Sequence, residues 1–373
     1  MDSYLGESIP KLGFGLMRLP KLGDEIDIEQ VKAMVDKFMA AGFKYFDTAY
    51  GYGDGASERA AKAALVDRYP RDSFYLATKL PAWTAKDEAD AKQMFYTSLE
   101  RTGAGYFDFY LLHNLGPGRK ETFDKFGIWD FLAERKKEGL IKHLGFSMHD
   151  TAEALDAVLT EHPEMEFVQL QINYSDWEDE KVQSKACYEV ARKHGKPVVI
   201  MEPVKGGSLA KLPEGAAAPL LEARPDLSVA SWGVRFAASL EGLVTVLSGM
   251  STLEQMENNI SFMQNFQPLT VAEYAAVAKT VDYLKSVPTI PCTGCSYCTK
   301  GCPQSINIPG VFNSFNSYKI YQNLDAAKPG YGFATMKGGK AADCVECGQC
   351  ESVCPQKLNI IEELKNASAL FDN

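Results

Sequence analysis

Eight of the nine cysteines in this 373-residue chain lie between residue 292 and the C-terminus, where they repeat one pattern. The stretches CTGCSYCTKGCP and CVECGQCESVCP both have the spacing C-x2-C-x2-C-x3-C-P. This spacing is typical of [4Fe-4S] clusters held by four thiolates, whereas zinc sites usually consist of two cysteine pairs separated by a longer loop. The pattern therefore predicts two [4Fe-4S] clusters. The predicted ligands are Cys292, Cys295, Cys298, Cys302, Cys344, Cys347, Cys350 and Cys354.

The fourth cysteine of each motif is expected to bind the cluster of the other motif, as in two-cluster ferredoxins. On that rule Cys354 completes the ligand set of the first motif and Cys302 completes that of the second. The segment 304–343 between the motifs is predicted to be helical, so this part of the chain resembles the α-helical ferredoxins. Two roles stay open for the clusters: they relay electrons to or from a redox protein partner, or they stabilise the fold of a domain that has only a small core.

The cysteine-rich part is predicted to be a domain of its own. The stretch SVPTIPC (286–292) has two prolines in seven residues, which is typical of a linker. The predicted domains are therefore residues 1–286 and 287–373. The ninth cysteine, Cys187, lies on a helical pattern in the first of them and is predicted to be buried.

The first 286 residues alternate short apolar runs with longer segments of helical spacing. Runs without polar alternation are typical of parallel strands buried on both faces. Eight strand–helix pairs in this length predict a (β/α)8 TIM barrel, and a doubly wound sheet is disfavoured because no G-x-G-x-x-G follows any strand. The predicted fold class is thus α/β, a TIM barrel followed by a small, mostly helical ferredoxin-like iron–sulfur domain. The eight runs are residues 11–17, 44–49, 74–80, 107–113, 143–147, 167–173, 197–201 and 244–249.

The charge and hydropathy of the chain exclude several classes of partner. Its formal net charge of -10 argues against nucleic acid and anionic membranes, because both repel an acidic surface. The most apolar long stretch, 231–250, is interrupted by Arg235 and Glu241, so no membrane span is predicted. The chain does not begin like a secretory signal, and a cytoplasmic location is expected.

Polar side chains stand at the carboxyl ends of four successive predicted strands, where the active sites of barrels lie. These are Asp47, Lys79, His113 and Ser147. A buried charge at such a place needs a partner, so Asp47 and Lys79 are expected to pair. A lysine cation near Tyr52 is expected to lower the pKa of that tyrosine below its usual value of about 10, which would favour proton transfer to a carbonyl oxygen. The four residues Asp47, Tyr52, Lys79 and His113 together predict a catalytic site.

The stretches FDTAYGYG, LATKL, FYLLH, GFS and PVVIMEPVKGG resemble the aldo-keto reductase family over nearly all of residues 10–265. The resemblance implies a nicotinamide-dependent (β/α)8 barrel with Tyr52 as general acid. It implies that Lys79 and Asp47 tune the pKa of Tyr52 and that His113 orients the substrate carbonyl. The whole chain resembles the branch of this family that carries a C-terminal domain with two [4Fe-4S] clusters.

The resemblance also implies a cofactor site, which this sequence matches in part. Ser147 and Gln169 match the residues that hold the nicotinamide amide, but Met148 replaces the family's Asn and Met201 replaces a stacking aromatic residue. The segment SGMSTLEQMENN leads from a strand into a helix start that can bind phosphate, with Thr252 and Gln255 as a capping box. Gly249 and Gln255 replace the basic pair for a 2′-phosphate, so NADP and NAD both stay open. The expected cofactor contacts are Leu16, Met17, Asp47, Ser147, Gln169, Met201, Pro203, Val204, Gly207, Leu209, Gly249, Ser251, Gln255 and Asn259.

These features favour an enzyme that transfers hydride between NAD(P)H and a small carbonyl or alcohol substrate, with two [4Fe-4S] clusters that relay electrons. The alternative is a non-catalytic electron-transfer or redox-sensing protein that binds a nucleotide. The loop after the strand that ends near His113 is expected to lie on the substrate side. Its Arg119 and Lys120 are expected to belong to a solvated face.

Overall fold

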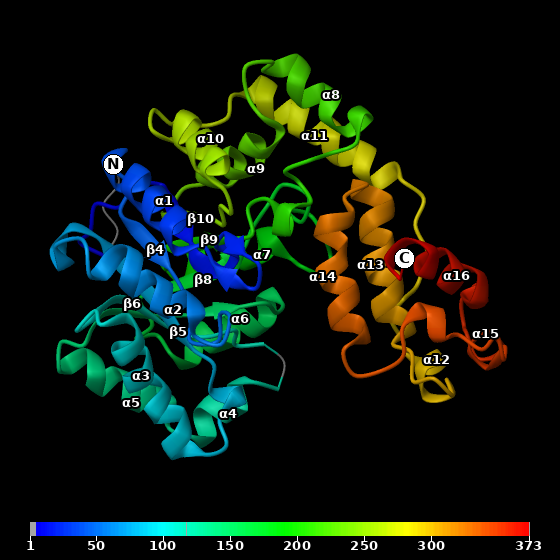
Figure 1. Ribbon diagram of the computed structural model, residues 1–373, viewed down its shortest axis with the longest axis horizontal. Helices are drawn as coiled ribbons and strands as arrows, with labels where there is room; N and C mark the ends of the chain where they lie inside the picture. The colour runs from blue at the N-terminus through cyan, green and yellow to red at the C-terminus, as the bar shows by residue number, and fades with distance from the viewer. Residues whose placement is uncertain (1–4, 117, 373) are drawn as a thin grey trace. The chain divides into compact units, whose positions relative to one another are not determined.

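The computed structural model describes residues 5–116 and 118–372 of the chain (Figure 1). Its internal contacts divide it into two compact units. The first unit comprises the chain up to Val204 together with Ser231–Thr270, and the second comprises Lys205–Ala230 together with Val271–Asn373. None of the helices among the described residues is both long enough and apolar enough to cross a lipid bilayer.

The first unit is built on a closed barrel of eight parallel strands within the described residues, in the order β1-β10-β9-β8-β7-β6-β5-β4. Strand β1 closes the barrel by pairing with both β4 and β10. Every predicted apolar run contributes a strand, which confirms the barrel and excludes the doubly wound sheet. The strands are β1 Leu12–Gly15, β4 Tyr45–Asp47, β5 Tyr75–Leu80, β6 Phe107–Leu112, β7 Ile141–Met148, β8 Phe167–Gln171, β9 Val198–Met201 and β10 Leu243–Ser248.

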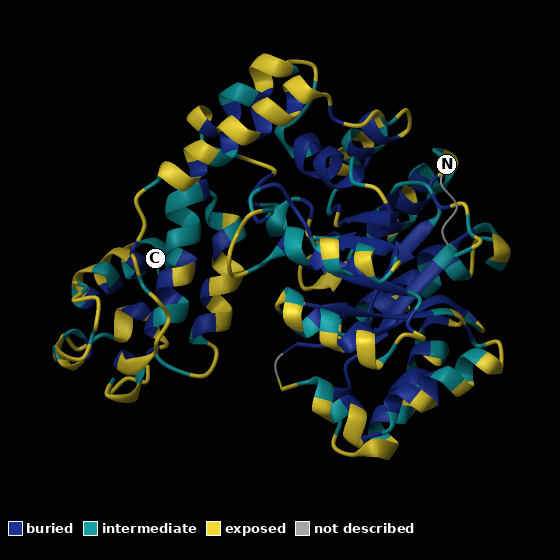
Figure 2. Cartoon of the chain, turned by 180° about the vertical axis from the view of Figure 1, so that it is seen from behind, coloured by how far each residue is buried: buried dark blue, intermediate teal, exposed yellow. Residues whose placement is uncertain are grey.

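The barrel interior is filled by side chains from successive strands, among them Tyr45, Phe109, Phe167 and Val199, all fully buried. Strands with both faces covered explain why the sequence shows continuous apolar runs. Gly145 of β7 has no room for a side chain, because a Cβ there would lie 2.4 Å from the carbonyl oxygen of Phe167. Figure 2 shows the strands as the most deeply buried part of this unit.

Helices connect the strands, and their ends follow local capping signals. Helix α1 begins where the Asp27 side chain accepts from the Gln30 backbone N–H at 3.1 Å. A short hairpin, β2 Lys21–Leu22 with β3 Glu25–Ile26, precedes it. The helices of this unit are α1 Ile28–Ala40, α2 Ala56–Ala61, α3 Glu88–Thr102, α4 Lys120–Lys125, α5 Ile128–Lys137, α6 Ala152–Glu161, α7 Ser184–Lys193 and α10 Leu253–Met263, with α9 Val229–Ala238 from its third residue on.

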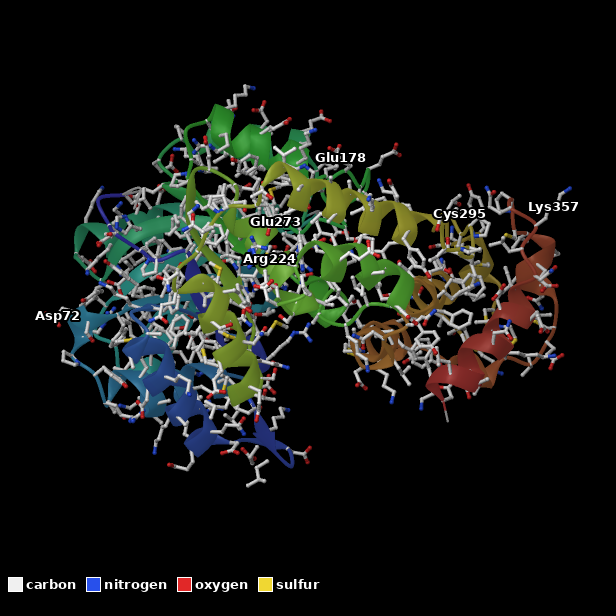
Figure 3. All side chains as sticks on the ribbon, turned by 90° about the horizontal axis from the view of Figure 1, so that it is seen from above. Asp72, Glu178, Arg224, Glu273, Cys295 and Lys357 are labelled. Carbon is white, nitrogen blue, oxygen red and sulfur yellow. The ribbon has the colours of Figure 1, made fainter. Side chains whose placement is uncertain are left out.

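The second unit is helical. Its cysteine-bearing part packs around a core that includes Ile306, Val311, Phe312 and Leu364. The helices α8 and α11 pack against each other in the same unit, where Arg224 and Glu273 form an ion pair at 3.4 Å (Figure 3). The helices are α8 Glu214–Ala223, α11 Val271–Ser286, α12 Tyr297–Lys300, α13 Ile308–Tyr321, α14 Leu324–Thr335, α15 Gln349–Ser352 and α16 Ile360–Phe371.

The contact-based division differs from the boundary proposed after residue 286. Residues 205–230 and helix α11 group with the cysteine-bearing helices rather than with the barrel. This grouping follows contacts between segments far apart in the sequence, such as the hydrogen bond from Thr280 Oγ1 to the Ala216 carbonyl at 2.9 Å. Composition changes along the chain, on which the boundary was based, do not report such contacts. The boundary therefore stays a prediction.

Candidate active site and candidate metal centres

A buried ion pair lies at the carboxyl ends of two adjacent barrel strands. Asp47 ends β4 and Lys79 lies near the end of β5, and the side chains of both are at most 4% exposed. Lys79 Nζ donates to Asp47 Oδ1 at 2.5 Å and to the Thr48 carbonyl at 2.7 Å. The predicted pairing of these two charges is therefore present, and each charge satisfies the other away from water.

Tyr52 and His113 lie next to this pair. Lys79 Nζ is 5.0 Å from the centroid of the Tyr52 ring, and the Lys79 charge acts on the Tyr52 hydroxyl. The Tyr52 and His113 rings meet edge to face with centroids 5.9 Å apart. The fold thus brings together all four side chains that the sequence predicts as a catalytic set.

The pKa of Tyr52 differs from the expectation. Burial raises it above its ordinary value of 10, and the opposing effect of the Lys79 charge does not outweigh burial. The expected lowering was therefore wrong in direction, because sequence spacing identifies Lys79 but not the desolvation of the hydroxyl. Tyr52 is consequently protonated at neutral pH.

The other members of the set have defined charge states. Burial lowers the pKa of Lys79, but the nearby Asp47 and Tyr52 more than compensate, so the pKa is raised and Lys79 is a cation. Burial, assisted by the Lys79 charge, holds the pKa of His113 well below its ordinary value. The imidazole is therefore neutral, and its buried Nδ1 has no hydrogen-bond partner among the described residues.

Two polar side chains suited to a nicotinamide amide lie side by side on β7 and β8. Ser147 and Gln169 are register partners, and both are at most 2% exposed. Gln169 Oε1 is buried without a hydrogen-bond partner among the described residues, and such an acceptor normally finds one. These residues therefore fit an amide-bearing ligand. Met148 is the next residue on β7 after Ser147, and alternation places its side chain on the opposite face of the strand.

The predicted phosphate segment connects β10 to helix α10. The Gln255 backbone N–H donates to Thr252 Oγ1 at 3.2 Å, so Thr252 is the N-cap as expected. Gln255 Oε1 accepts from the Ser251 N–H at 2.7 Å rather than from the N-cap residue, so the reciprocal bond is shifted by one residue. Ser251 Oγ donates to the Arg18 carbonyl at 2.6 Å, which ties this segment to the loop after β1.

The remaining predicted cofactor contacts are distributed over both units. Leu16 is buried and Met17 is exposed, just after β1, and Met201 ends β9. Asn259 on α10 is buried, with an Oδ1 that lacks a partner among the described residues. Pro203, Val204 and Gly249 belong to the barrel unit, whereas Gly207 and Leu209 belong to the second unit.

One aromatic residue of the site was not predicted from the sequence, and one predicted surface cation contacts it. Trp83 follows β5, and its ring is 5.4 Å from that of His113. The guanidinium carbon of Arg119 lies 4.6 Å from the Trp83 ring centroid, and Arg119 is half-buried. Lys120 is also half-buried and pairs with Asp124 and Glu161. The position of Trp83, four residues after Lys79 at a strand end, was the signal that could have identified it.

The two cysteine motifs fold alike. Helices α12 and α15 start 52 residues apart, as do α13 and α16, and this is also the offset between the motifs. Unusual backbone conformations repeat with the same offset, because left-handed φ values occur at equivalent positions in both motifs. These positions are Gly294, Ser296 and Ser305 in the first motif and Glu346, Gly348 and Lys357 in the second.

Each cysteine set lines a separate cavity. One cavity is lined by Cys292, Cys295, Cys298 and Cys354. A second cavity is lined by the other four cysteines, with Cys302 joining the second motif. Among the described residues, no group of His, Cys, Asp or Glu side chains is arranged to hold a single metal ion. Four thiols around a cavity fit a cluster, and the grouping is the one that crossed ligation predicts.

The exposure of two cysteines bears on their reactivity. Cys295, in the first cysteine motif, is exposed to solvent (Figure 3). Cys187 on α7 is buried as expected, and burial raises the pKa of its thiol to about 11. Cys187 is therefore an inert thiol of the barrel unit.

Comparison with protein-family models gives two matches. The model of the aldo/keto reductase family matches residues 11–282, and that of a 4Fe-4S dicluster domain matches residues 291–358. Together they agree with the sequence-based expectation of a reductase-like barrel followed by an iron–sulfur domain.

Curated relatives include three reductases. The chain is 34% identical over 220 residues to an aldo-keto reductase of Strobilurus tenacellus, which covers 55% of this chain and 61% of that protein. It is 32% identical over 143 residues to an aldo-keto reductase of Mycobacterium sp. (strain KMS), covering 38% and 47%. A methylglyoxal reductase of Yersinia pestis is 30% identical over 143 residues, covering 38% and 46%. The chain thus spans about half the length of the curated relatives that it matches.

Solved structures share the barrel. An aldo-keto reductase from Bacillus halodurans in its holo form has a TM-score of 0.58 at 24% identity, over 74% of this chain and 93% of that one. An aldo-keto reductase from Klebsiella pneumoniae in complex with NADPH has a TM-score of 0.58 at 21% identity, over 73% and 90%. Identities this low show a common fold.

Proposed function

Because this chain belongs to the aldo/keto reductase family, we propose that it interconverts a small carbonyl compound and its alcohol, with a nicotinamide dinucleotide as hydride carrier. The observation that carries the proposal is the position of the Tyr52 ring, whose centroid is 5.0 Å from Nζ of Lys79, a buried cation with Asp47 as its counter-ion. Relatives named aldo-keto reductase and methylglyoxal reductase support a carbonyl substrate, and the NADPH complex of the Klebsiella pneumoniae enzyme supports the cofactor.

The chemistry follows from the charge states of the site. NADPH, when bound, supplies the hydride that adds to the carbonyl carbon. The protonated Tyr52 hydroxyl donates its proton to the carbonyl oxygen, and Lys79 stabilises the phenolate that remains until solvent returns a proton. Neutral His113 hydrogen-bonds to the same oxygen and orients it. Asp47 keeps Lys79 charged and in place.

The chain's own residues fit the cofactor at two points. The unpaired acceptor Gln169 Oε1 and the neighbouring Ser147 would hold the nicotinamide amide. The capped start of α10, with the Ser251 to Gln255 turn, would hold the pyrophosphate through backbone N–H groups.

Arg18 favours NADP over NAD. Gly249 stands where the family has a basic residue, and a Cβ at Gly249 would lie 3.9 Å from Arg18 Cδ. Arg18 therefore brings a positive charge from the β1 loop to the place where Gly249 supplies none. Its side chain has no ion-pair partner among the described residues. We propose that Arg18 contacts the 2′-phosphate of NADP.

Replacement of Arg18 by Met should raise the Kd for NADPH about tenfold and leave the Kd for NADH nearly unchanged, because only NADPH carries the extra phosphate. Titration of each nucleotide against intrinsic fluorescence measures both constants. Lys21→Met removes a nearby exposed charge and serves as the matched control. Equal losses for the two nucleotides would assign Arg18 a general electrostatic role instead.

The reductase proposal is tested by the consumption of NADPH at 340 nm with an activated aldehyde such as 4-nitrobenzaldehyde. We expect turnover with NADPH and aldehyde together, and nucleotide binding without aldehyde. Binding without turnover for any carbonyl tested would support the alternative, a non-catalytic redox sensor or electron carrier. Failure of both nucleotides to bind would contradict both hypotheses.

For the cysteine-rich part we propose two [4Fe-4S] clusters with crossed ligation that pass electrons to each other. The support is that the two cavities are both lined by Ile308, so one side chain lies between them. Cys295 and Cys347 are the exposed members of the two sets and offer a route to a redox protein partner. The cytoplasmic location and the exclusion of nucleic-acid and membrane partners stay predictions.

A further inference from the structure

Arg119 is held above an aromatic ring at the edge of the candidate active site. Its guanidinium carbon is 4.6 Å from the Trp83 ring centroid, and the Trp83 ring is 5.4 Å from that of His113. Together these two distances place the guanidinium of Arg119 within about 10 Å of the His113 imidazole. His113 in turn contacts Tyr52, so the cation belongs to the surroundings of the proposed proton donor.

Arg119 has no counter-ion in the described part of the chain, although the chain has 49 acidic and only 39 basic residues. No Asp or Glu of the described residues forms an ion pair with it, whereas the adjacent Lys120 pairs with Asp124 at 2.8 Å and Glu161 at 3.0 Å. Stacking on an indole face satisfies the apolar face of a guanidinium and leaves its N–H edge available. The N–H groups of that edge can donate two parallel hydrogen bonds to the oxygens of a planar carboxylate.

The loop that carries Arg119 is anchored to the barrel. Asn114 has a left-handed φ of 50°, and its N–H donates to Ser147 Oγ at 2.7 Å. The Leu115 N–H donates to the Ser147 carbonyl at 2.8 Å, and the Arg119 N–H donates to the Gly116 carbonyl at 3.0 Å. The cation is therefore positioned by backbone contacts that exist without a ligand, which lowers the entropic cost of binding.

We propose that Arg119 binds a carboxylate of the substrate, so that the carbonyl compounds reduced at Tyr52 are aldehyde or ketone carboxylic acids. The proposal rests on the reductase function proposed above and names its substrate class. The carbonyl would lie at Tyr52 and His113, the carbon skeleton along Trp83, and the carboxylate on Arg119. One unpaired cation matches a monoanion, whereas a phosphate monoester with nearly two charges would leave charge unmatched.

The electrostatics of His113 agree with this arrangement. After burial and the Lys79 charge, the charges of His149 and Arg119 also contribute to the low pKa of His113. Arg119 thus acts on the reacting end of the site while its N–H edge stays free. A bound carboxylate would neutralise this charge.

The test compares two aldehydes that differ in one charge, 4-formylbenzoate and its methyl ester, with the full-length protein and NADPH. Arg119→Met keeps an apolar contact with Trp83 but removes the cation. We expect kcat/KM for 4-formylbenzoate to fall about 10- to 100-fold, mainly through KM, because a charge-assisted bidentate contact is lost. We expect kcat/KM for the ester, which has no charge to pair with Arg119, to fall much less than kcat/KM for the acid in the same variant. Lys120→Met, which removes the neighbouring paired cation, should affect neither aldehyde.

Equal losses for acid and ester in Arg119→Met, or no loss for the acid, would overturn the proposal while the reductase function stands. Calorimetric titration of 4-formylbenzoate into the NADP⁺-bound protein tests the anion site without turnover. Weaker binding to Arg119→Met supports the proposal even if no aldehyde is reduced, and unchanged binding overturns it. The aldehyde 4-formylphenyl phosphate is the third substrate tested. A higher kcat/KM of the wild-type protein for it than for 4-formylbenzoate would overturn the assignment to a carboxylate.

Discussion

Tyr52→Phe is expected to lower kcat for the reduction of an activated aldehyde by about 10²–10⁴, with the Kd for NADPH nearly unchanged. The substitution removes the hydroxyl on which the Lys79 charge acts and leaves the ring that meets His113 edge to face. The loss should appear in the hydride-transfer step, because no other described group at this place combines a proton donor with a buried cation. Single-turnover measurements with NADPH bound beforehand separate this step from product release.

Tyr50→Phe is the matched control for this experiment. Tyr50 lies on the same turn, and its ring stacks with the Arg101 guanidinium carbon at 4.4 Å, a contact that phenylalanine preserves. Its kcat should stay within twofold of the wild-type value. Near-normal turnover of Tyr52→Phe would contradict the assignment of the proton donor.

Cys302→Ala is expected to destroy the cluster held by the second motif and to leave the cluster of the first motif intact. The purified chain should contain eight irons, as two four-iron clusters require, and the variant should retain about four. The physical reason is that Cys302 lines the same cavity as Cys344, Cys347 and Cys350, whereas the first motif has Cys354 as its fourth thiol. Anaerobic iron analysis and electron paramagnetic resonance of the reduced protein measure the loss.

Double variants decide which cluster is lost. If ligation is crossed, Cys302→Ala combined with Cys347→Ala removes two ligands of one cluster, and about four irons remain. Cys302→Ala combined with Cys295→Ala then damages both clusters, and few irons remain. If ligation is uncrossed, about four irons remain in the variant with Cys302→Ala and Cys295→Ala, and few remain in the variant with Cys302→Ala and Cys347→Ala. Cys187→Ala, which changes the buried cysteine of the barrel unit, should retain all eight irons.

Most of the fold could be predicted because its signals are local. The eight apolar runs became the eight barrel strands, since a strand buried on both faces must be apolar along its length. Thr252 caps α10 as expected because an N-cap needs only its own side chain and a backbone N–H three residues on. The cysteine spacing predicted sets of four thiols, and the cavities group the cysteines in those sets.

Other features depend on which distant segments meet. The residue types of the predicted catalytic set were evident from the sequence. The direction of the Tyr52 pKa shift was not, because burial of the hydroxyl outweighs the effect of Lys79. Arg119 was expected in a solvated face because charged residues in a loop usually are, and only the fold brings it onto Trp83. The Arg18 side chain lies beside Gly249, so the segments that follow the first and last barrel strands approach each other although these residues are 231 positions apart in the sequence.

The sequence by itself determined the barrel, the two cysteine motifs and the types of the four residues of the predicted catalytic set, Asp47, Tyr52, Lys79 and His113. Each of these depends on the order of residues within a short window, and apolar periodicity or ligand spacing records that order directly. The tertiary structure alone decided the protonation of Tyr52, the grouping of α8 and α11 with the cysteine-bearing helices, and the unpaired position of Arg119. These depend on desolvation and on contacts across long sequence separations, which act through space and leave no local pattern in the chain.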